Sequence, residues 1–155
     1  MTGWRVGWMV TPARYAETLA ALSECFNTGT TVFTQPAAIA ALEQGESIVQ
    51  ELRAGYARGR EIVMSTLGQD PIIQISEPEG AFYVFARIPG LRSSLRFAER
   101  LADEARVGVA PGYTFGPGNE EYFRICFAQS HERLAEALQR TRDFVHREHA
   151  SLVSD

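Results

Sequence analysis

The sequence predicts an α+β domain, preceded by one strand–helix unit of the kind found in α/β folds. A long helical pattern over residues 35–67 is followed by short strands that alternate with helices. A separate apolar stretch at residues 4–10 reads as a strand with no neighbouring strand to pair with. We therefore expect residues 1–34 to be a remnant of a larger domain and residues 35–155 to form a domain of their own.

The first predicted element is a buried strand over residues 4–10, which are mostly apolar apart from Arg5 and end before Pro12. Proline suits the first turn of a helix, so a helix should follow over residues 13–26. Its apolar residues recur at helical spacing: Tyr15, Leu19, Leu22 and Phe26.

The longest predicted element is a helix over residues 35–67. Its alanine-rich beginning favours helix, and it carries an apolar face: Leu42, Val49, Leu52, Tyr56 and Val63. Gly45 interrupts the pattern and predicts a bend. The sequence Gly68 to Pro71 ends the helix.

The second half contains four segments with the composition of strands: 72–75, 81–88, 107–110 and 122–127. Between the second and the third, Ser93 or Ser94 can cap a helix that runs to about residue 104. After the fourth, Ser130 can cap a final helix with inward-facing residues at helical spacing: Leu134, Leu138, Thr141 and Val145. This alternation predicts a compact α+β domain.

Composition excludes several classes of partner. The net charge is −4 and no basic stripe carries interleaved aromatic residues, so no nucleic-acid partner is expected. No window approaches the ~20 apolar residues that span a bilayer, so no membrane partner is expected either. Cys25 and Cys126 form no C-x-x-C pair, which favours a buried, reduced pair in a cytoplasmic protein. No further ligand completes a metal site around His146 and His149.

Two arginines are notable because each lies within an apolar strand. A buried arginine needs an anionic partner, since an unpaired charge is costly away from water. The partner of Arg5 is either an acidic side chain or a phosphate group, which matches the planar guanidinium. For Arg124, the residues alone leave two interpretations open: an edge-strand arginine paired with a surface carboxylate, or an arginine with a functional role.

Two further segments combine aromatic residues with glycine: 80–85 and 111–116. In the first segment, core packing is favoured for Phe82 and Phe85, whereas the role of Tyr83 stays open. The second segment belongs to a glycine-rich stretch that leads into a strand. A loop that binds nucleotide phosphates normally leads into a helix, so such a loop is not predicted here.

Four segments resemble, in order, motifs of the class I/II aminotransferases, the fold-type I enzymes that use pyridoxal 5'-phosphate (PLP): Met1–Trp8, Gly80–Phe85, Pro111–Gly116 and Arg124–Ala128. The resemblance implies that residues 1–34 belong to the large cofactor-binding domain and that residues 35–155 are the C-terminal small domain. It also implies that the intact enzyme binds PLP, acts on an amino acid and a 2-oxo acid, and is a homodimer.

The resemblance assigns roles to four residues of this chain. Arg5 would bind the phosphate of PLP. Arg124 would bind the α-carboxylate of the amino-acid substrate through two parallel hydrogen bonds. Tyr83 and Phe115 would contact the substrate.

The lysine that binds PLP covalently in this family precedes the first motif, at a position that falls before Met1. The chain contains 15 arginines and no lysine. We therefore expect a fragment with no catalytic residue, which neither holds PLP nor turns over substrate by itself. Two alternatives stay open. One is another fold-type I PLP enzyme, such as a C–S lyase, and the other is a non-catalytic, stand-alone module for binding or dimerisation.

Overall fold

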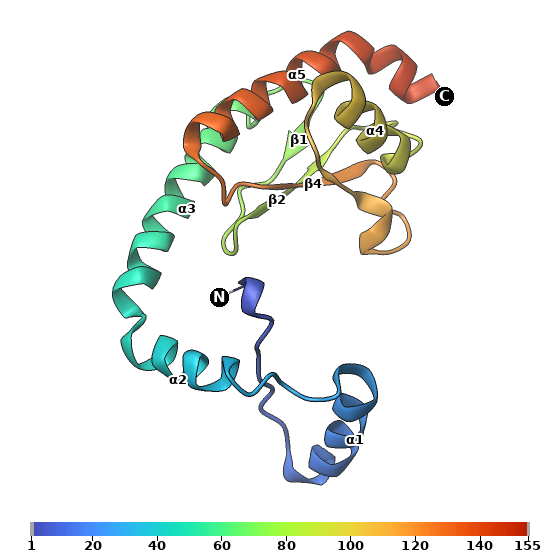
Figure 1. Cartoon of the computed structure of the whole chain (residues 1–155). Coiled ribbons are helices and arrows are strands. Elements are labelled where there is room, and N and C mark those ends of the chain that lie inside the picture. Colours follow the sequence, from blue (N-terminus) through green and yellow to red (C-terminus); the bar gives the residue numbers. More distant parts are fainter. Residues whose placement is uncertain (1, 155) are drawn as a thin grey trace. The chain divides into compact units, whose positions relative to one another are not determined.

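The computed structural model describes residues 2–154. The chain forms two compact units, Met1–Glu51 and Leu52–Asp155 (Figure 1). Helices and one small antiparallel sheet make up the structure, as the predicted α+β class requires. The predicted division between residues 34 and 35 stays a prediction.

The first unit is helical. Short 3-10 turns, η1 (Thr2–Trp4) and η2 (Ala13–Tyr15), come before the helices α1 (Ala16–Asn27) and α2 (Thr34–Gln44). The long helix α3 (Glu46–Leu67) begins in this unit and ends in the second. Both predicted helices are confirmed, and so is the interruption at Gly45. A Cβ atom at Gly45 would overlap the carbonyl oxygen of Ala41, so the turn between α2 and α3 accepts only glycine without a shift of the backbone.

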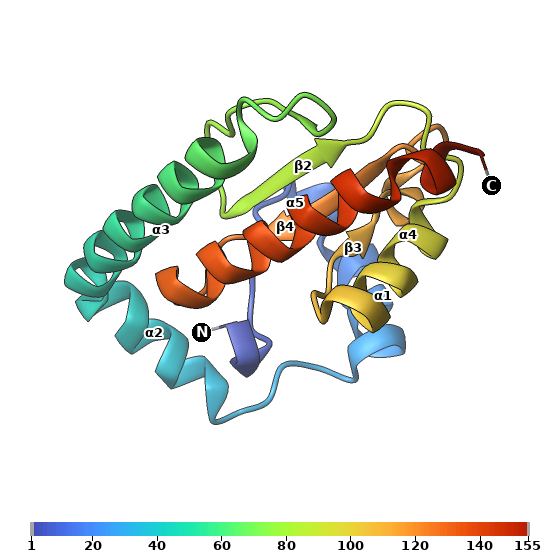
Figure 2. The ribbon, with the colours of Figure 1, turned by 90° about the horizontal axis from the view of Figure 1, so that it is seen from above.

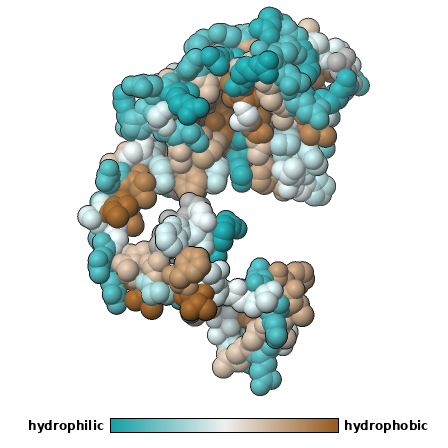
Figure 3. Space-filling view, viewed as in Figure 1, coloured by the Kyte–Doolittle hydropathy of each residue, from teal (hydrophilic) through white to brown (hydrophobic). Residues whose placement is uncertain are grey.

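The predicted buried strand at residues 4–10 is wrong. Residues 5–10 form neither helix nor strand, Arg5 has a φ of 52°, and Val10 is 92% exposed. A strand needs a hydrogen-bonding neighbour, and residues 2–51 contain no other strand. Among residues 3–51 only Thr34 is buried. Figure 3 shows hydrophobic side chains on the surface of this unit, where Trp8, Phe26 and Phe33 are among the exposed residues.

Both cysteines are free, but the prediction of a buried pair is wrong for Cys25, which is exposed on α1. None of the residues of α1 is buried, because no other element of the first unit covers this helix. Cys126, at the end of strand β4, is half-buried.

The second unit contains a four-stranded antiparallel sheet with the order β1-β2-β4-β3. The strands are β1 (Gln74–Ile75), β2 (Tyr83–Arg87), β3 (Ala110–Pro111) and β4 (Tyr122–Cys126). Each overlaps one of the four predicted strands. The predicted helix after residue 93 is α4 (Ser94–Arg100), continued by a wider helical turn, η3 (Leu101–Ala105). A 3-10 turn, η4 (Gly112–Phe115), follows β3, and α5 (His131–Ser154) is the last helix.

The core lies between one face of this sheet and the helices α4 and α5 (Figures 1 and 2). Side chains alternate between the faces of a strand, so Val84 and Ala86 of β2 and Phe123 and Ile125 of β4 point into the core. The helices contribute further buried residues: Val63, Leu67, Phe97, Leu101, Leu134, Leu138, Phe144 and Val145. The opposite face of β2 and β4 therefore remains available for a functional site.

Local contacts define the start of α4 and the approach of α3 to the sheet. The predicted cap Ser93 accepts a hydrogen bond from the Arg96 N–H at 3.2 Å through its side-chain oxygen. In α3, a Cβ atom at Gly59 would lie 2.7 Å from the carbonyl oxygen of Phe127. The absence of a side chain at Gly59 thus allows α3 to approach the end of β4.

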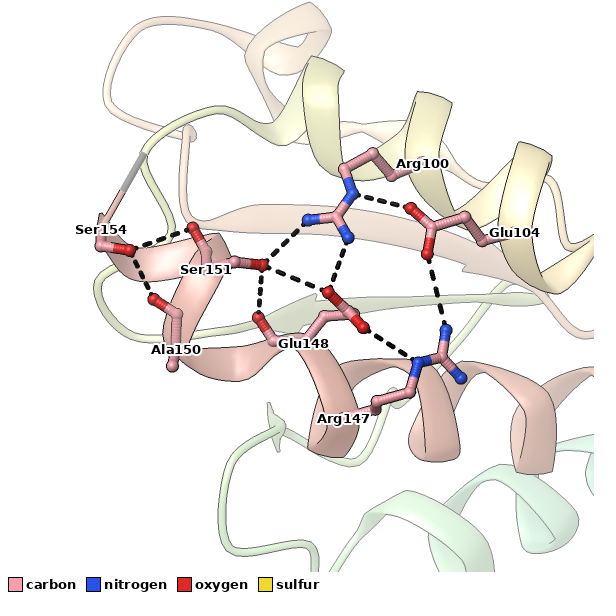
Figure 4. Close-up of polar contacts among 7 residues, drawn as sticks. All are labelled: Arg100, Glu104, Arg147, Glu148, Ala150, Ser151 and Ser154. Carbon is pink, nitrogen blue, oxygen red and sulfur yellow. Dashed lines mark hydrogen bonds and ion pairs between the residues drawn. The ribbon is translucent and has the colours of Figure 1, made fainter.

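A network of charged side chains joins α4 and η3 to α5 (Figure 4). Arg100 donates hydrogen bonds to Glu148 at 2.7 Å, to Glu104 at 2.8 Å and to Ser151 at 3.0 Å. Arg147 completes the network by pairing with Glu148 at 2.9 Å and with Glu104 at 3.6 Å. The Arg100 guanidinium, followed by Arg147, lowers the pKa of Glu148.

Among the ion pairs of the described residues, the carboxylate most shielded from solvent is that of Asp70, in the turn after α3. The Asp70 side chain is 0% exposed and accepts hydrogen bonds from the backbone N–H of Ile72 and of Ile73 at 2.9 and 3.0 Å. On α5, His146 Nε2 lies 2.8 Å and Arg142 Nε 3.2 Å from the same carboxylate. Burial raises the pKa of Asp70, but hydrogen bonds from Ile73, His146 and Ile72 outweigh this effect and hold the pKa below its ordinary value.

Replacement of Asp70 by asparagine should therefore destabilise the protein in a pH-dependent way. A carboxylate whose pKa is lower in the folded state than the unfolded value of 3.8 stabilises the fold above that pH, and this contribution is lost as pH falls through the folded pKa. Urea unfolding should show that Asp70→Asn costs about 1–3 kcal/mol at neutral pH and much less at the lowest pH where the protein remains folded. The control is Asp143→Asn, an exposed position on the same helix as His146. An equal cost for Asp70→Asn at both pH values would contradict the prediction.

Candidate functional site

The sheet face opposite the core carries a cluster of arginine and aromatic side chains. In β2 and β4, every second residue points to this face and is only partly buried or exposed: Tyr83, Phe85, Arg87, Tyr122, Arg124 and Cys126. The pairing register places Phe85 opposite Arg124 and Arg87 opposite Tyr122. The aromatic residues therefore surround the two arginines.

Arg124 lies at the middle of β4, between β2 and β3 in the sheet. Its Cζ atom is 4.2 Å from the centre of the Tyr83 ring and 4.5 Å from the centre of the Phe115 ring. Within residues 2–154, no hydrogen bond or ion pair of the Arg124 side chain is present. The strand β4 is not an edge strand, and no carboxylate of residues 2–154 pairs with Arg124, so the interpretation as a surface ion pair is wrong for the described part of the chain.

Arg87 shows the contrasting arrangement on the same face. Its guanidinium donates from Nε to Glu121 at 2.6 Å and from a terminal nitrogen to Gln74 at 3.2 Å. The Gly90 N–H and the Arg87 guanidinium together lower the pKa of Glu121, which stays ionised and neutralises the charge of Arg87. Arg124 is thus the arginine on this face whose positive charge has no counter-charge among the described residues.

The position of Phe115 depends on the turn η4. Gly112 is buried, and a Cβ atom there would overlap the carbonyl oxygens of Asn119 and Tyr122. The Asn119 side chain donates to the carbonyl oxygens of Phe115 at 3.3 Å and of Gly116 at 3.2 Å. The glycine allows the turn to pack tightly and the asparagine closes it, so that Phe115 reaches Arg124.

The prediction that Phe85 packs in the core is wrong, because its side chain is 37% exposed on the site face. It stacks on Tyr122 with ring centres 4.8 Å apart and meets Phe115 edge-on at 5.6 Å. Phe82 does pack against the core, as predicted. The two-residue alternation along the strand was the available signal, since it places Phe85 on the same face as Tyr83.

The structure brings three of the four predicted site residues together: Arg124, Tyr83 and Phe115. Arg5 belongs to the other compact unit, where it is exposed and not part of a strand. Its predicted role in binding the phosphate of PLP stays a prediction.

Comparison with known proteins identifies the family of the chain. The family model described as aminotransferase class I and II matches residues 1–140. The chain belongs to this aminotransferase family. It is 42% identical over 143 residues to the aspartate aminotransferase of Pyrococcus horikoshii, covering 90% of this chain and 37% of that protein. It is 37% identical over 142 residues to the LL-diaminopimelate aminotransferase of Desulforudis audaxviator, covering 92% of this chain and 36% of that protein.

Solved structures of aminotransferases confirm the predicted fold. The aromatic aminotransferase from Pyrococcus horikoshii is 36% identical and superimposes with a TM-score of 0.83, covering 96% of this chain and 40% of that chain. This aminotransferase chain therefore spans about two fifths of the length of its relatives, as the prediction of a fragment requires.

The residues present in this aminotransferase chain do not form a complete site for PLP. The sequence contains no lysine to bind the cofactor covalently, and Arg5 is a single exposed guanidinium. Among the described residues, no group of histidine, cysteine or carboxylate side chains could hold a metal ion. No helix within residues 2–154 is long and apolar enough to cross a membrane.

Proposed function

We propose that this chain is the C-terminal portion of a PLP-dependent aminotransferase that transfers an amino group between an amino acid and a 2-oxo acid. The observation that carries the proposal is the Arg124 guanidinium, which lies between two aromatic rings and has no acidic partner among the described residues. Membership of the aminotransferase family and the ordered motifs support it.

Arg124 would bind the carboxylate that the amino acid and the 2-oxo acid have in common. A guanidinium presents parallel N–H groups that match the two oxygens of a carboxylate, so the bound group is oriented as well as attracted. Both substrates carry this carboxylate beside the reacting carbon. A single arginine can therefore orient the substrate in both halves of the transfer.

The remaining functions belong to the intact enzyme and are part of the proposal. Arg5 would bind the phosphate of PLP, Tyr83 and Phe115 would border the substrate, and the enzyme would be a cytoplasmic homodimer. The exposed apolar side chains of the first unit support an extensive interface with further protein, because exposed apolar patches commonly mark such surfaces. We assign no proton-transfer step to this chain, since it lacks the lysine.

The proposal is tested in a chimera in which the N-terminal part of the Pyrococcus horikoshii aspartate aminotransferase precedes this chain. Arg124→Gln should raise KM for the amino acid and for the 2-oxo acid, because it removes the partner of a desolvated carboxylate. Such a loss costs on the order of 2–5 kcal/mol, or roughly two or more decades in kcat/KM.

The matched control is Arg92→Gln, an exposed arginine outside the sheet, which should leave KM unchanged. The absorbance of bound PLP should persist in both variants. A chimera with Arg124→Gln that retains normal KM values for both substrates would refute the assignment of the carboxylate site.

A further inference from the structure

We propose that Tyr83 and Phe115 are positioning residues that hold the Arg124 guanidinium in place of an acidic partner. This inference rests on the proposed function, because it explains how Arg124 can be ordered and still be free to bind a carboxylate. It adds a contact with the arginine to the expected contact of these two rings with the substrate.

An arginine side chain has many rotamers, and a site that binds a ligand through it must restrict them. Elsewhere in this unit, carboxylates do so. Glu121 fixes Arg87 on the same sheet face, and Glu148 fixes Arg100 between two helices. Arg124 is only half-exposed, yet none of its nitrogen atoms has such a partner within residues 2–154.

A carboxylate would be the wrong support for an arginine that binds substrate. It would occupy the N–H donors and compete with the substrate for the same charge. An aromatic ring attracts the cation through its electron-rich face and does not accept the conventional N–H···O hydrogen bonds that a carboxylate forms. Two rings can therefore restrict the guanidinium while its N–H groups stay available for an anion.

The two rings reach Arg124 from separate elements, and each ring has a further aromatic contact. Tyr83 begins β2, the neighbour of β4 on one side, and its ring lies 4.5 Å from that of Phe82, which packs against the core. Phe115 follows β3, the neighbour on the other side, and meets Phe85 edge-on at 5.6 Å. Rigid support on both sides of β4 is what a positioning role requires.

The first measurement uses the 155-residue chain without cofactor or substrate. The Nε–H signal of Arg124 is identified in a two-dimensional ¹⁵N–¹H spectrum by its loss in Arg124→Gln. Tyr83→Leu and Phe115→Leu should each move this signal, because each removes a ring current, and should speed its exchange with water. Tyr83→Phe keeps the ring and should restore the native signal. Tyr113→Leu is the matched control, because Tyr113 lies in the same turn as Phe115 and is similarly exposed, but among the described residues its ring has no cation–π contact with Arg124.

The second measurement uses the chimera. Tyr83→Leu and Phe115→Leu should each raise KM for both substrates by about 3- to 30-fold, as the strength of a cation–π contact implies. Tyr113→Leu should change KM less than twofold, and Tyr83→Phe, which keeps the ring, should raise KM less than Tyr83→Leu does. A leucine variant that loses the dispersed amide signals of the fold is replaced by the methionine variant at the same position, Tyr83→Met or Phe115→Met. Methionine keeps much of the side-chain volume but has no ring.

Two failures are distinguishable. If Arg124→Gln raises KM while the leucine variants behave like Tyr113→Leu, Arg124 binds the carboxylate and the positioning role is overturned. If Arg124→Gln leaves KM unchanged, the proposed function fails, and the Nε–H signal alone then decides whether the rings hold the guanidinium. An Nε–H signal that is the same in the native chain and in both leucine variants overturns the positioning role in either case.

Discussion

The 155-residue chain, supplied with PLP, an amino acid and a 2-oxo acid, should show no transamination above the rate without protein. It contains no lysine, so no side-chain amine can bind the cofactor covalently or transfer the substrate proton. General acid–base catalysis alone typically contributes 10²–10⁴-fold, and Arg124 offers no equivalent because guanidinium does not release its proton.

Chromatographic measurement of the product amino acid checks the rate, with the chimera as the active control. Borohydride treatment followed by mass spectrometry checks for a covalent cofactor adduct, which should be absent from every side chain. A rate comparable to that of the chimera, or a reduced adduct on an internal residue, would show that another group of this chain replaces the lysine.

Phe97→Ala should be the most destabilising single truncation of a side chain in the second unit. Phe97 is fully buried, with its ring centre 4.7 Å from that of Phe123 on β4 and 6.1 Å from that of Phe144 on α5. Truncation of such a residue costs about 3–5 kcal/mol through lost burial and the cavity left behind. This is a large part of the ~5–15 kcal/mol that stabilises a typical domain.

Chemical denaturation followed by circular dichroism measures this loss. Leu95→Ala, an exposed position on the same helix, should change the free energy of unfolding by about 0.5 kcal/mol or less. A similar effect for both substitutions would show that the core does not depend on the contact of α4 with the sheet.

The sequence was sufficient to predict elements whose signals are local. Helical spacing and the cap at Ser93 predicted the helices, and a composition rich in aromatic and β-branched residues predicted the strands of the second unit. The strand at residues 4–10 failed because a strand also depends on a neighbour, and periodicity contains no information about whether one exists. The β-propensity of a segment depends on its own residues, whereas the formation of a strand also requires a neighbouring strand that accepts and donates its backbone hydrogen bonds.

The site was predictable to a similar extent. An arginine in an apolar strand identified Arg124, but its environment depends on the order of the strands, which a single sequence does not specify. β2 and β4 are neighbours in the sheet without being consecutive in the chain. The meeting of Tyr83 and Phe115 at Arg124 follows from this adjacency. The separation of Phe85 from Phe82 needed only the alternation of side chains along one strand.

The same adjacency has a consequence for the order of events during folding. The segment between β2 and β4 contains α4, η3 and β3, so the two strands must close a long loop before they pair. Non-local pairing of this kind is slow compared with the formation of helices or of the neighbouring β1–β2 pair. One face of the paired strands completes the core and the other brings Tyr83 to Arg124. We therefore expect the contact of Tyr83 with Arg124 and the closed hydrophobic interior to arise in a single late step.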